Sequence, residues 1–238
     1  MRVGIMQPYF LPYLGYFSLI HATDKWVVFD DVQFIRHGWI ERNRVLNSQK
    51  ELSYIKVPLN KHSRGVFIKD LTINNNLDWK KKIFDQLTSY KNKAPYYYET
   101  LELLKEVFNE NFESISTLNI HLLRAVCKHV GIPFNYLVFS EMNLNLRDDV
   151  KHPGQWALQI TTAIGGNVYI NPVGGKDLFL ESEFIQSNIK LLFCQNNLVR
   201  YEQNNLEFKA GLSIIDALMF NSRREVLELI KKYKLLEK

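Results

Sequence analysis

The sequence predicts an α/β fold, with a Rossmann-like parallel or mixed sheet flanked by helices. Short apolar runs typical of buried strands alternate with segments of helical spacing along most of the chain. Two of these runs, at 2–6 and 25–30, end in polar loops, as strands do at the ligand-binding edge of an open sheet. Helical segments follow one another around 77–130, which predicts a helical insertion there. We expect a single α/β domain over 1–238, because no linker or repeat interrupts this pattern.

Apolar runs and helical spacing define the expected elements in order. Strands are expected at residues 2–6, 25–30, 53–58, 135–140, 167–170 and 190–194, and a further strand or edge segment at 66–73. Helices are expected at residues 14–23, 77–90, 95–109, 114–130, 153–164, 178–187, 213–220 and 222–236. Local breaks support some of these boundaries, since Gly131 follows the helix at 114–130 and Ser213 suits the N-cap of the helix at 213–220.

The composition is that of an ordinary globular protein. Of 238 residues, 46% are hydrophobic and 23% charged, and no apolar run reaches the roughly 18 residues of a membrane span. The chain opens with a strand pattern rather than a signal peptide, and Cys127 and Cys194 suit free thiols, so we expect a cytoplasmic protein. The net charge of +5 comes mainly from scattered lysines, without the arginine and aromatic stripe of a nucleic-acid groove. It also suits an anionic small-molecule ligand.

The segment at 7–17 has the layout of a ligand site. A strand ends, a loop with two prolines follows, and a helix opens near Gly15. A loop at the carboxyl end of a strand, followed by a helix N-terminus, can offer backbone N–H groups to an anion. We therefore expect Gln7 to orient sugar hydroxyls, and Tyr9 and Tyr16 to stack on a base or a sugar ring.

Residues 30–44 bring acids, amides and arginines together. Arg42 and Arg44 alternate, so they share one side of an extended segment, where paired guanidinium groups suit phosphate or carboxylate binding. Asn43 lies between them, and Trp39 offers a further stacking surface, so both belong to the expected binding set. The alternative is a solvated hairpin whose acids pair internally with the arginines.

Two carboxylates and a histidine are the candidate general bases. Asp30 and Asp31 end the second expected strand, and Gln33 follows as a further group that can orient a sugar. Adjacent carboxylates can also hold a metal ion or orient a ribose, and spacing alone does not choose among these roles. His152 precedes the helix at 153–164, and the pKa of histidine lies near neutrality; a capping or surface histidine is the alternative. No pair of histidines or cysteines has zinc-site spacing, so no metal is assigned.

Two later segments complete the expected site. Gly174 and Lys176 lie in a loop between a strand and a helix, where glycine permits close backbone approach and lysine can meet a phosphate. The spacing is not that of a P-loop, and a plain Gly-Gly turn is the alternative. Asp216 follows Ser213 by three residues, so it either completes a capping-box variant or faces the site from the first helical turn.

A set of segments in order along nearly the whole chain carries a family resemblance. They are Gln7 to Tyr9, Leu14 to Phe17, Phe29 to Phe34, Arg42 to Arg44, Trp79, Tyr90, Ala94 to Tyr96, Ser140, Glu141, Tyr169, Gly174 to Asp177, Tyr201, Gln203 and Leu212 to Asp216. These segments resemble the WbqC-like protein family, whose members tend to be encoded among genes for O-antigen and other surface polysaccharides. The resemblance implies a role in lipopolysaccharide biosynthesis. His152 to Trp156 and Asn171-Pro172 depart from the residues common in relatives, and both departures bear on the substrate.

The opening segment also resembles nucleotidylyltransferases of the HIGH superfamily. There too a first strand leads into a proline-containing loop and a glycine at the helix start. Tyr13 and Tyr16-Phe17 stand where that signature has histidines, so the likeness implies a shared topology with a degenerate site.

Three functions follow as hypotheses. The first is a transferase that passes an acyl or aminoacyl group, delivered by a carrier protein or coenzyme A, to the amine of a nucleotide-activated sugar. The second is ATP-dependent nucleotidyl or adenylyl transfer at a degenerate HIGH-like site. The third is a non-catalytic binding protein of the polysaccharide pathway. Convergence of Asp31, Arg42, Lys176 and Asp216 on one pocket would argue against it, whereas scattering of these four residues over the surface would argue against an enzyme. The sequence assigns no cofactor.

Overall fold

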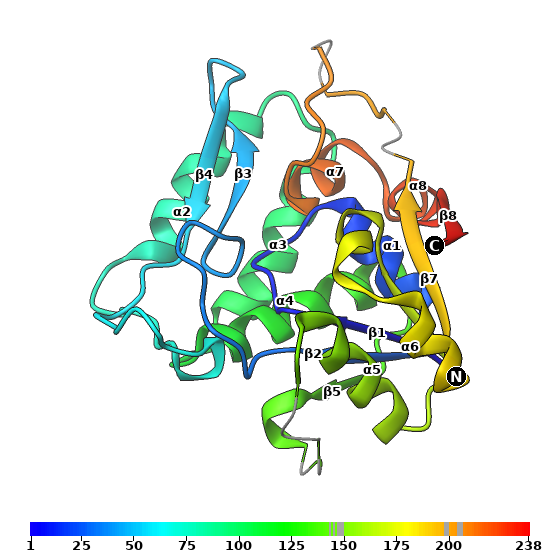
Figure 1. The fold of residues 1–238 in the computed structure, drawn as a ribbon. Helices are drawn as coiled ribbons and strands as arrows, with labels where there is room; N and C mark the ends of the chain where they lie inside the picture. The colour runs from blue at the N-terminus through cyan, green and yellow to red at the C-terminus, as the bar shows by residue number, and fades with distance from the viewer. Residues whose placement is uncertain (143, 145, 147–149, 198–199, 204–206) are drawn as a thin grey trace.

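A six-stranded sheet forms the centre of the protein in a computed structural model, which describes residues 1–142, 144, 146, 150–197, 200–203 and 207–238 (Figure 1). The strand order is β5-β2-β1-β6-β7-β8. The strands are β1 Arg2–Met6, β2 Lys25–Val28, β5 Tyr136–Val138, β6 Val168–Pro172, β7 Lys190–Asn196 and β8 Tyr233–Glu237. All neighbours are parallel except β7 and β8, which are antiparallel. The expected α/β class and mixed sheet are confirmed.

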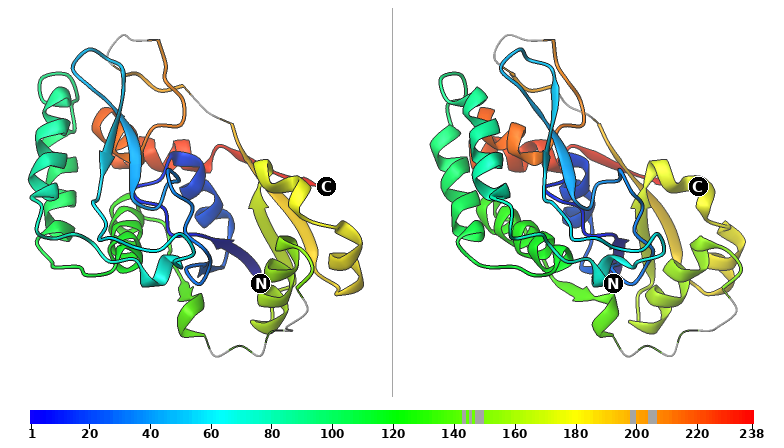
Figure 2. Two further views of the ribbon diagram at one scale, coloured as in Figure 1. Left: turned by 60° about the vertical axis from the view of Figure 1, so that its left-hand side comes forward. Right: turned by 90° about the vertical axis from the view of Figure 1, so that its left-hand side faces the viewer.

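Helices cover both faces of this sheet because its central strands are apolar on both sides. On one face, Val3, Ile5 and Val27 pack with α5 Pro153–Ala163 and α6 Glu181–Gln186. On the other face, α1 Leu14–Ala22 packs on β1, β6 and β7. Behind it, α8 Arg223–Lys231 packs on α1, on α4 Ile115–Val130 and on α7 Ile214–Phe220. Figure 2 shows these two layers on opposite sides of the strands. Continuous apolar runs are what a parallel sheet buried on both faces requires.

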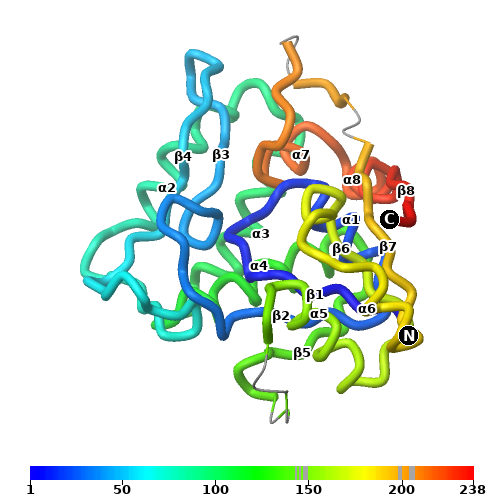
Figure 3. Tube along the Cα trace, in the orientation of Figure 1, coloured from blue at the N-terminus to red at the C-terminus, as the bar shows by residue number. Residues whose placement is uncertain are grey.

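The long segment between β2 and β5 builds a side structure next to the sheet. It contains a two-stranded antiparallel hairpin, β3 Arg42–Leu46 and β4 Leu52–Lys56. After the hairpin come η1 Ile68–Asp70, α2 Trp79–Leu87, η2 Thr88–Tyr90, α3 Tyr97–Phe108 and α4. The tube in Figure 3 shows the hairpin beside α2, to the left of the sheet. The expected helical layer around 77–130 is therefore present.

The strand order reverses between β1 and β6. From β1 the chain adds β2 and β5 on one side, and then β6 and β7 on the other. The carboxyl ends of these five parallel strands lie along one edge, which we call the carboxyl edge. In open α/β sheets, ligands bind at this edge, near the point of reversal.

Several expected elements differ from the structure. The helix expected at 222–236 ends at Lys231, and residues 233–237 form β8 instead. β8 completes the hydrogen bonds of the outer edge of β7, which would otherwise stay open. The strand expected at 66–73 is a short 3-10 turn with isolated bridges, and the helix expected at 178–187 is confined to α6, after the 3-10 segment η4 Val173–Leu178.

Within the described part of the chain, no helix has the length and apolar character needed to cross a bilayer. Both cysteines are buried free thiols. Burial raises the pKa of the Cys194 thiol to about 12, and it raises the pKa of the Cys127 thiol as well, so neither is an activated nucleophile.

Candidate functional site

The loop after β1, residues 7–13, is held in place by side chains from three other elements. Tyr16 Oη donates to the Gln7 carbonyl at 2.8 Å, and Asn43 Nδ2 donates to the Phe10 carbonyl at 3.0 Å. Asn119 Nδ2 on α4 binds both this loop and the Ile40 carbonyl. These donors satisfy the loop's carbonyl groups and fix its path across the carboxyl edge.

The expected ligand-binding residues of this loop divide into exposed and buried groups. Gln7 is half-buried, and its side chain has no hydrogen-bond partner among the described residues, so it is free to meet a ligand. Tyr9 is half-buried against Tyr16, with ring centroids 5.6 Å apart. Tyr16 is 2% exposed, so it supports the loop rather than offering a stacking surface. A Cβ at Gly15 would lie 2.4 Å from the Tyr13 ring, which explains why this position is glycine.

The β3–β4 hairpin carries two arginines over aromatic rings. Arg42 and Arg44 share one face, as their alternation predicts, and Arg42 Cζ lies 4.4 Å from the centre of the Tyr54 ring. Arg44 Cζ lies 5.3 Å from the Trp39 ring. We call these four residues the cationic hairpin face. A guanidinium over a ring stays planar and accessible from its edge, which suits it to bind phosphate or carboxylate.

Arg44 has an unused donor. Its Nη2 donates to the Gly211 carbonyl at 3.0 Å, while its Nε–H is buried without an acceptor among the described residues. Two backbone hydrogen bonds fix the segment around Arg44. Phe10 N in the loop after β1 donates to Trp39 O, and Ser213 N at the start of α7 donates to Arg44 O, both at 2.8 Å. The hairpin face therefore borders the carboxyl edge.

The two adjacent aspartates have different environments. Asp30 is 2% exposed, and its carboxylate accepts bonds from Ser140 N at 3.0 Å and from Ser140 Oγ at 2.7 Å. This carboxylate joins the ends of β2 and β5. Asp31 is half-buried and pairs with Lys69 Nζ at 2.8 Å. The aspartates therefore do not pair with the hairpin arginines, so the internally paired hairpin is wrong; Asp31 is the more accessible of the two.

Gln33 lies further along the same segment. It is exposed, and its Nε2 donates to the Arg64 carbonyl at 3.2 Å. A hollow of about 470 Å³ opens beside Asp31, lined by that carboxylate, by Ser140 and by seven apolar side chains. We call it the apolar hollow.

His152 forms a pair that the sequence did not reveal. It is the N-cap residue of α5, and its Nε2 lies 2.9 Å from Glu183 Oε2 on α6. Gln155 Nε2 donates to the other carboxylate oxygen at 2.8 Å. Partial desolvation opposes ionisation of Glu183, but the bonds from Gln155 and His152 hold its pKa below the usual value. The N-termini of α5 and α6 both follow strands that end at the carboxyl edge, which places the pair there.

Gly174 and Lys176 lie in η4, after β6. Gly174 is exposed, whereas Lys176 Nζ lies 3.4 Å from the Glu237 carbonyl and 5.7 Å from the centre of the Phe193 ring. Lys176 therefore turns along β7 and β8 and is not brought to the hairpin arginines. Neighbouring Gly175 is required by close approach, since a Cβ there would stand 2.3 Å from Asn171 Oδ1.

Asp216 is withdrawn into the interior. It is 0% exposed, and it accepts bonds from Tyr201 Oη at 2.6 Å, Gln203 Nε2 at 2.8 Å and Tyr90 Oη at 2.9 Å. Burial raises the pKa of this carboxyl, although the three bonds act in the opposite direction. The cluster ties residues 201 and 203 to α7, next to the Gly211 carbonyl that Arg44 binds.

The expected site residues thus form separate groups rather than one pocket, so the convergence that would have argued against a non-catalytic binding protein is not observed. Asp31 lines the apolar hollow, Arg42 lies on the hairpin face, Lys176 lies against β8, and Asp216 is buried. Apart from Lys176 and Asp216, the groups border the carboxyl edge. The sequence analysis did not identify several residues that contact the expected site residues, because each of them is distant in the sequence from its partner. They are Ser140, Glu183 and the partners of Asp216.

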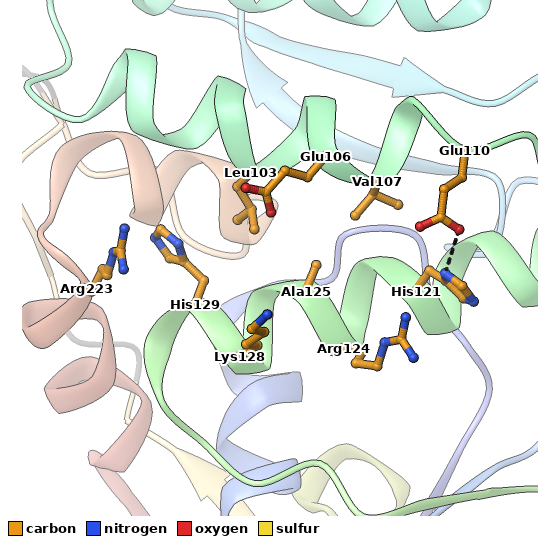
Figure 4. Close-up of a pocket in the computed structure, with 10 residues that line it drawn as sticks. All are labelled: Leu103, Glu106, Val107, Glu110, His121, Arg124, Ala125, Lys128, His129 and Arg223. Carbon is orange, nitrogen blue, oxygen red and sulfur yellow. Dashed lines mark ion pairs between the residues drawn. The ribbon is translucent and has the colours of Figure 1, made fainter.

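Another hollow, of about 520 Å³, lies between α3 and α4 (Figure 4). Its acids are Glu106 on α3 and Glu110 just beyond the end of α3, and most of its bases come from α4. Glu110 pairs with His121 at 3.4 Å, and Glu99 pairs with Arg223 at 2.5 Å. The described lining of this hollow holds more permanent cations than carboxylates. The cations are Arg124, Lys128 and Arg223, and the carboxylates are Glu106 and Glu110.

Comparison with known proteins identifies the family. The model of the WbqC-like protein family matches residues 7–228. The chain belongs to the WbqC-like protein family. It is also 32% identical over 234 residues to "Uncharacterized protein Rv1507c" of Mycobacterium tuberculosis (strain ATCC 25618 / H37Rv), an alignment that covers 97% of each chain. No solved structure gives a significant match. The family expected from the sequence is therefore confirmed.

Proposed function

We propose that this WbqC-like protein is a cytoplasmic transferase of bacterial surface-polysaccharide biosynthesis. It passes an acyl or aminoacyl group to the amine of a nucleotide-activated amino sugar. The observation that carries this proposal is the pair of guanidinium groups, Arg42 and Arg44, held over aromatic rings on the cationic hairpin face. Paired guanidinium groups bind a phosphate through charge-assisted, bidentate hydrogen bonds.

The surroundings of Arg44 suit a nucleotide diphosphate. Arg42 and Arg44 supply paired cations, and Trp39 and Tyr54 supply aromatic surfaces beside them. The parallel strand order reverses at β1 and β6, the place where nucleotides bind in doubly wound sheets. Gln7, which follows β1, has a side-chain amide without a partner in the described part of the chain, and it can bind sugar hydroxyls.

The transfer step needs a base, and His152 is our assignment. The amine nitrogen attacks the carbonyl carbon of an acyl thioester, so that a C–N bond forms and the C–S bond breaks. His152 takes the amine proton and gives it to the departing sulfur, which leaves as a thiol. When its Nε2–H donates to Glu183, Nδ1 carries the free lone pair, and Glu183 stabilises the protonated ring.

Binding of nucleotide sugars tests this proposal directly. We expect UDP- or dTDP-linked amino sugars to raise the melting temperature of the protein, because they bind only its folded state. Arg44→Ala should weaken binding, measured by calorimetry, by about tenfold or more, since a bond to a charged group is lost. Arg36→Ala is the matched control, because this arginine is exposed on the same segment.

The result also separates the other functions. Equal affinity in the Arg44→Ala and Arg36→Ala variants would refute the site. A shift with ATP and Mg²⁺ alone would favour nucleotidyl or adenylyl transfer. Absence of a shift with any nucleotide would favour a non-catalytic binding protein.

A further inference from the structure

Residues 33–68, which run from beyond β2 through the hairpin to η1, carry the protein's excess positive charge. They contain seven lysines and arginines and two glutamates, so their net charge of +5 equals that of the whole chain. Of the 30 basic and 25 acidic residues in all, 23 of each remain elsewhere, so the rest of the chain is neutral. A surface region of one sign attracts partners of the opposite charge.

Pairing of β3 with β4 places several of these cations on one face of the hairpin, which extends away from the sheet (Figure 1). In the antiparallel register, Lys56 lies opposite Arg42, and Tyr54 lies opposite Arg44. Opposite residues share a face of the ribbon, so Lys56 extends the cationic hairpin face. Lys56 is exposed, and the Tyr54 side chain is 43% exposed. The sequence alone shows no stripe of cations and rings because its members come from different strands.

The turn at 35–38 adds a further cation next to β3. Arg42 Nη2 donates to the His37 carbonyl at 2.5 Å, and Arg42 Nε donates to the Gly38 carbonyl at 3.4 Å. These bonds hold the turn against β3, and Arg36 in the turn is exposed. The positive surface of the hairpin therefore continues onto the turn.

The loop at 60–66 lies beside the residues that lead into this turn. Gln33 Nε2 donates to the Arg64 carbonyl at 3.2 Å, and Phe34 N donates to the Val66 carbonyl at 2.9 Å. Arg64 and Lys61 on this loop are exposed. Three segments thus form one surface, which we call the basic strip: Arg36, Arg42, Tyr54, Lys56, Lys61 and Arg64.

Neighbouring acids do not neutralise the basic strip. In the described part of the chain, none of the seven lysines and arginines of residues 33–68 pairs with a carboxylate, whereas the adjacent Lys69 pairs with Asp31 at 2.8 Å. Of the two glutamates in the segment, Glu41 is only 4% exposed. The structure describes residues 1–142 without a gap, so it describes the whole strip. A polyanion that binds these cations gains the entropy of its released counterions.

The exposed ring within the basic strip favours a nucleic acid over other polyanions. Cations follow the phosphates of a single strand, and its bases stack on aromatic rings and guanidinium planes. Arg42 Cζ, 4.4 Å from the centre of the Tyr54 ring, brings both kinds of surface together. An acidic protein would use the cations and leave the ring without a role.

From these observations we infer that the basic strip binds single-stranded nucleic acid. This activity goes beyond the proposed transferase and does not depend on it. Arg42 and Tyr54 belong to the cationic hairpin face as well, whereas Arg36, Lys56, Lys61 and Arg64 belong to the basic strip alone.

Fluorescence anisotropy with labelled oligonucleotides tests the inference. The probes are single-stranded RNA and DNA of about 12 nucleotides, a length within the range of single-strand sites, and the corresponding DNA duplex. We expect both single strands to bind, and their affinity to fall as salt rises from about 50 to 200 mM, because phosphate contacts release counterions.

Substitutions separate the contribution of the cations from that of the ring. Lys56→Ala combined with Arg64→Ala should weaken single-strand binding about tenfold or more near 50 mM salt, and should reduce the salt slope by about 0.7 for each cation removed. Arg124→Ala combined with Lys128→Ala, at exposed cations of α4, is the matched control and should change neither. Tyr54→Leu should weaken single strands about fivefold, with the salt slope and the affinity for the duplex unchanged.

Several results would overturn the inference. They are undetectable binding at low salt, equal weakening by the two double substitutions, and unchanged affinity of Tyr54→Leu for single strands. Polyglutamate bound as tightly as RNA would indicate an acidic protein partner instead, and phosphatidylserine vesicles that retain the protein when RNA is added would indicate a membrane surface. Tighter binding of RNA than of DNA would assign the strip to RNA, through its 2′-hydroxyls, and equal binding would assign it to single strands of both kinds.

The same variants separate this inference from the proposed function. If nucleotide sugars bind through Arg44 while the two double substitutions affect single strands equally, only the assignment of the basic strip fails. If single strands bind through Lys56 and Arg64 while no nucleotide sugar binds, the transferase fails and the basic strip stands.

Discussion

Replacement of the buried Asp216 by asparagine tests whether burial or hydrogen bonding has the larger effect on the pKa of this carboxyl group. The carboxylate accepts three side-chain bonds at full burial. Asparagine keeps the shape and one acceptor oxygen, which can serve Tyr201 and Gln203. Its NH₂ group would then face Tyr90, whose oxygen already accepts a bond from Leu46 N at 2.8 Å. Loss of one charge-assisted bond costs about 2 kcal/mol where the wild-type carboxyl is ionised.

The raised pKa of Asp216 determines how the stability difference between the two proteins changes with pH. Burial raises the pKa of Asp216 in the folded protein, above the value of about 3.9 in an unfolded chain. The folded state therefore holds the proton more tightly, and the stability that Asp216 contributes is complete below pH 3.9 and is lost as pH rises towards the folded pKa. Asparagine has no such titration. The stability of the wild type relative to Asp216→Asn should consequently fall with rising pH, by at most about 1.4 kcal/mol per pH unit.

Urea unfolding of both proteins between pH 4 and 8 measures this difference. Other groups titrate equally in the two proteins, so their contributions cancel. Tyr201→Phe is a useful companion, because it removes a bond that lowers the pKa and should extend the fall to higher pH. A difference that grows with pH would mean that the three hydrogen bonds outweigh burial, and the reasoning would be refuted.

Two further predictions concern stability. Asp30→Ala should lower the free energy of unfolding by about 3 kcal/mol, measured with urea, because two bonds to Ser140 are lost; Asp30→Asn should cost about 1, since an amide can replace both. Equal losses of unfolding free energy in the two variants would contradict this prediction. Gly131→Ala should cost about 1 kcal/mol and lower the melting temperature by roughly 2–4 °C, because φ is +78° at the C-cap of α4 and no atom crowds the site. An unchanged melting temperature would show that alanine adopts the positive φ at this position without strain.

Local patterns were sufficient for the central part of the fold. The runs at β1 and β2 are apolar on both faces, which only a sheet covered on both sides accommodates. Ser114 and Gly131 bound α4 by capping, a property of the sequence itself. The alternation of Arg42 and Arg44 likewise predicted their shared face.

Other features depended on contacts between distant segments. The last residues alternate poorly and suit a helix, yet the open edge of β7 made them a strand. Asp30 was a plausible base until Ser140, 110 residues away, occupied its carboxylate. No spacing rule pairs His152 with Glu183 either.

The sequence by itself determined the family, the alternating α/β architecture and which residue types gather after the strands. It did so because burial, capping and side-chain alternation act over a few neighbouring residues. Only the tertiary structure decided which of those polar groups stay available. Asp216 and Asp30 are used internally, whereas the half-buried Gln7 side chain has no hydrogen-bond partner among the described residues. The reason is physical: a polar group's availability depends on what the rest of the chain packs against it.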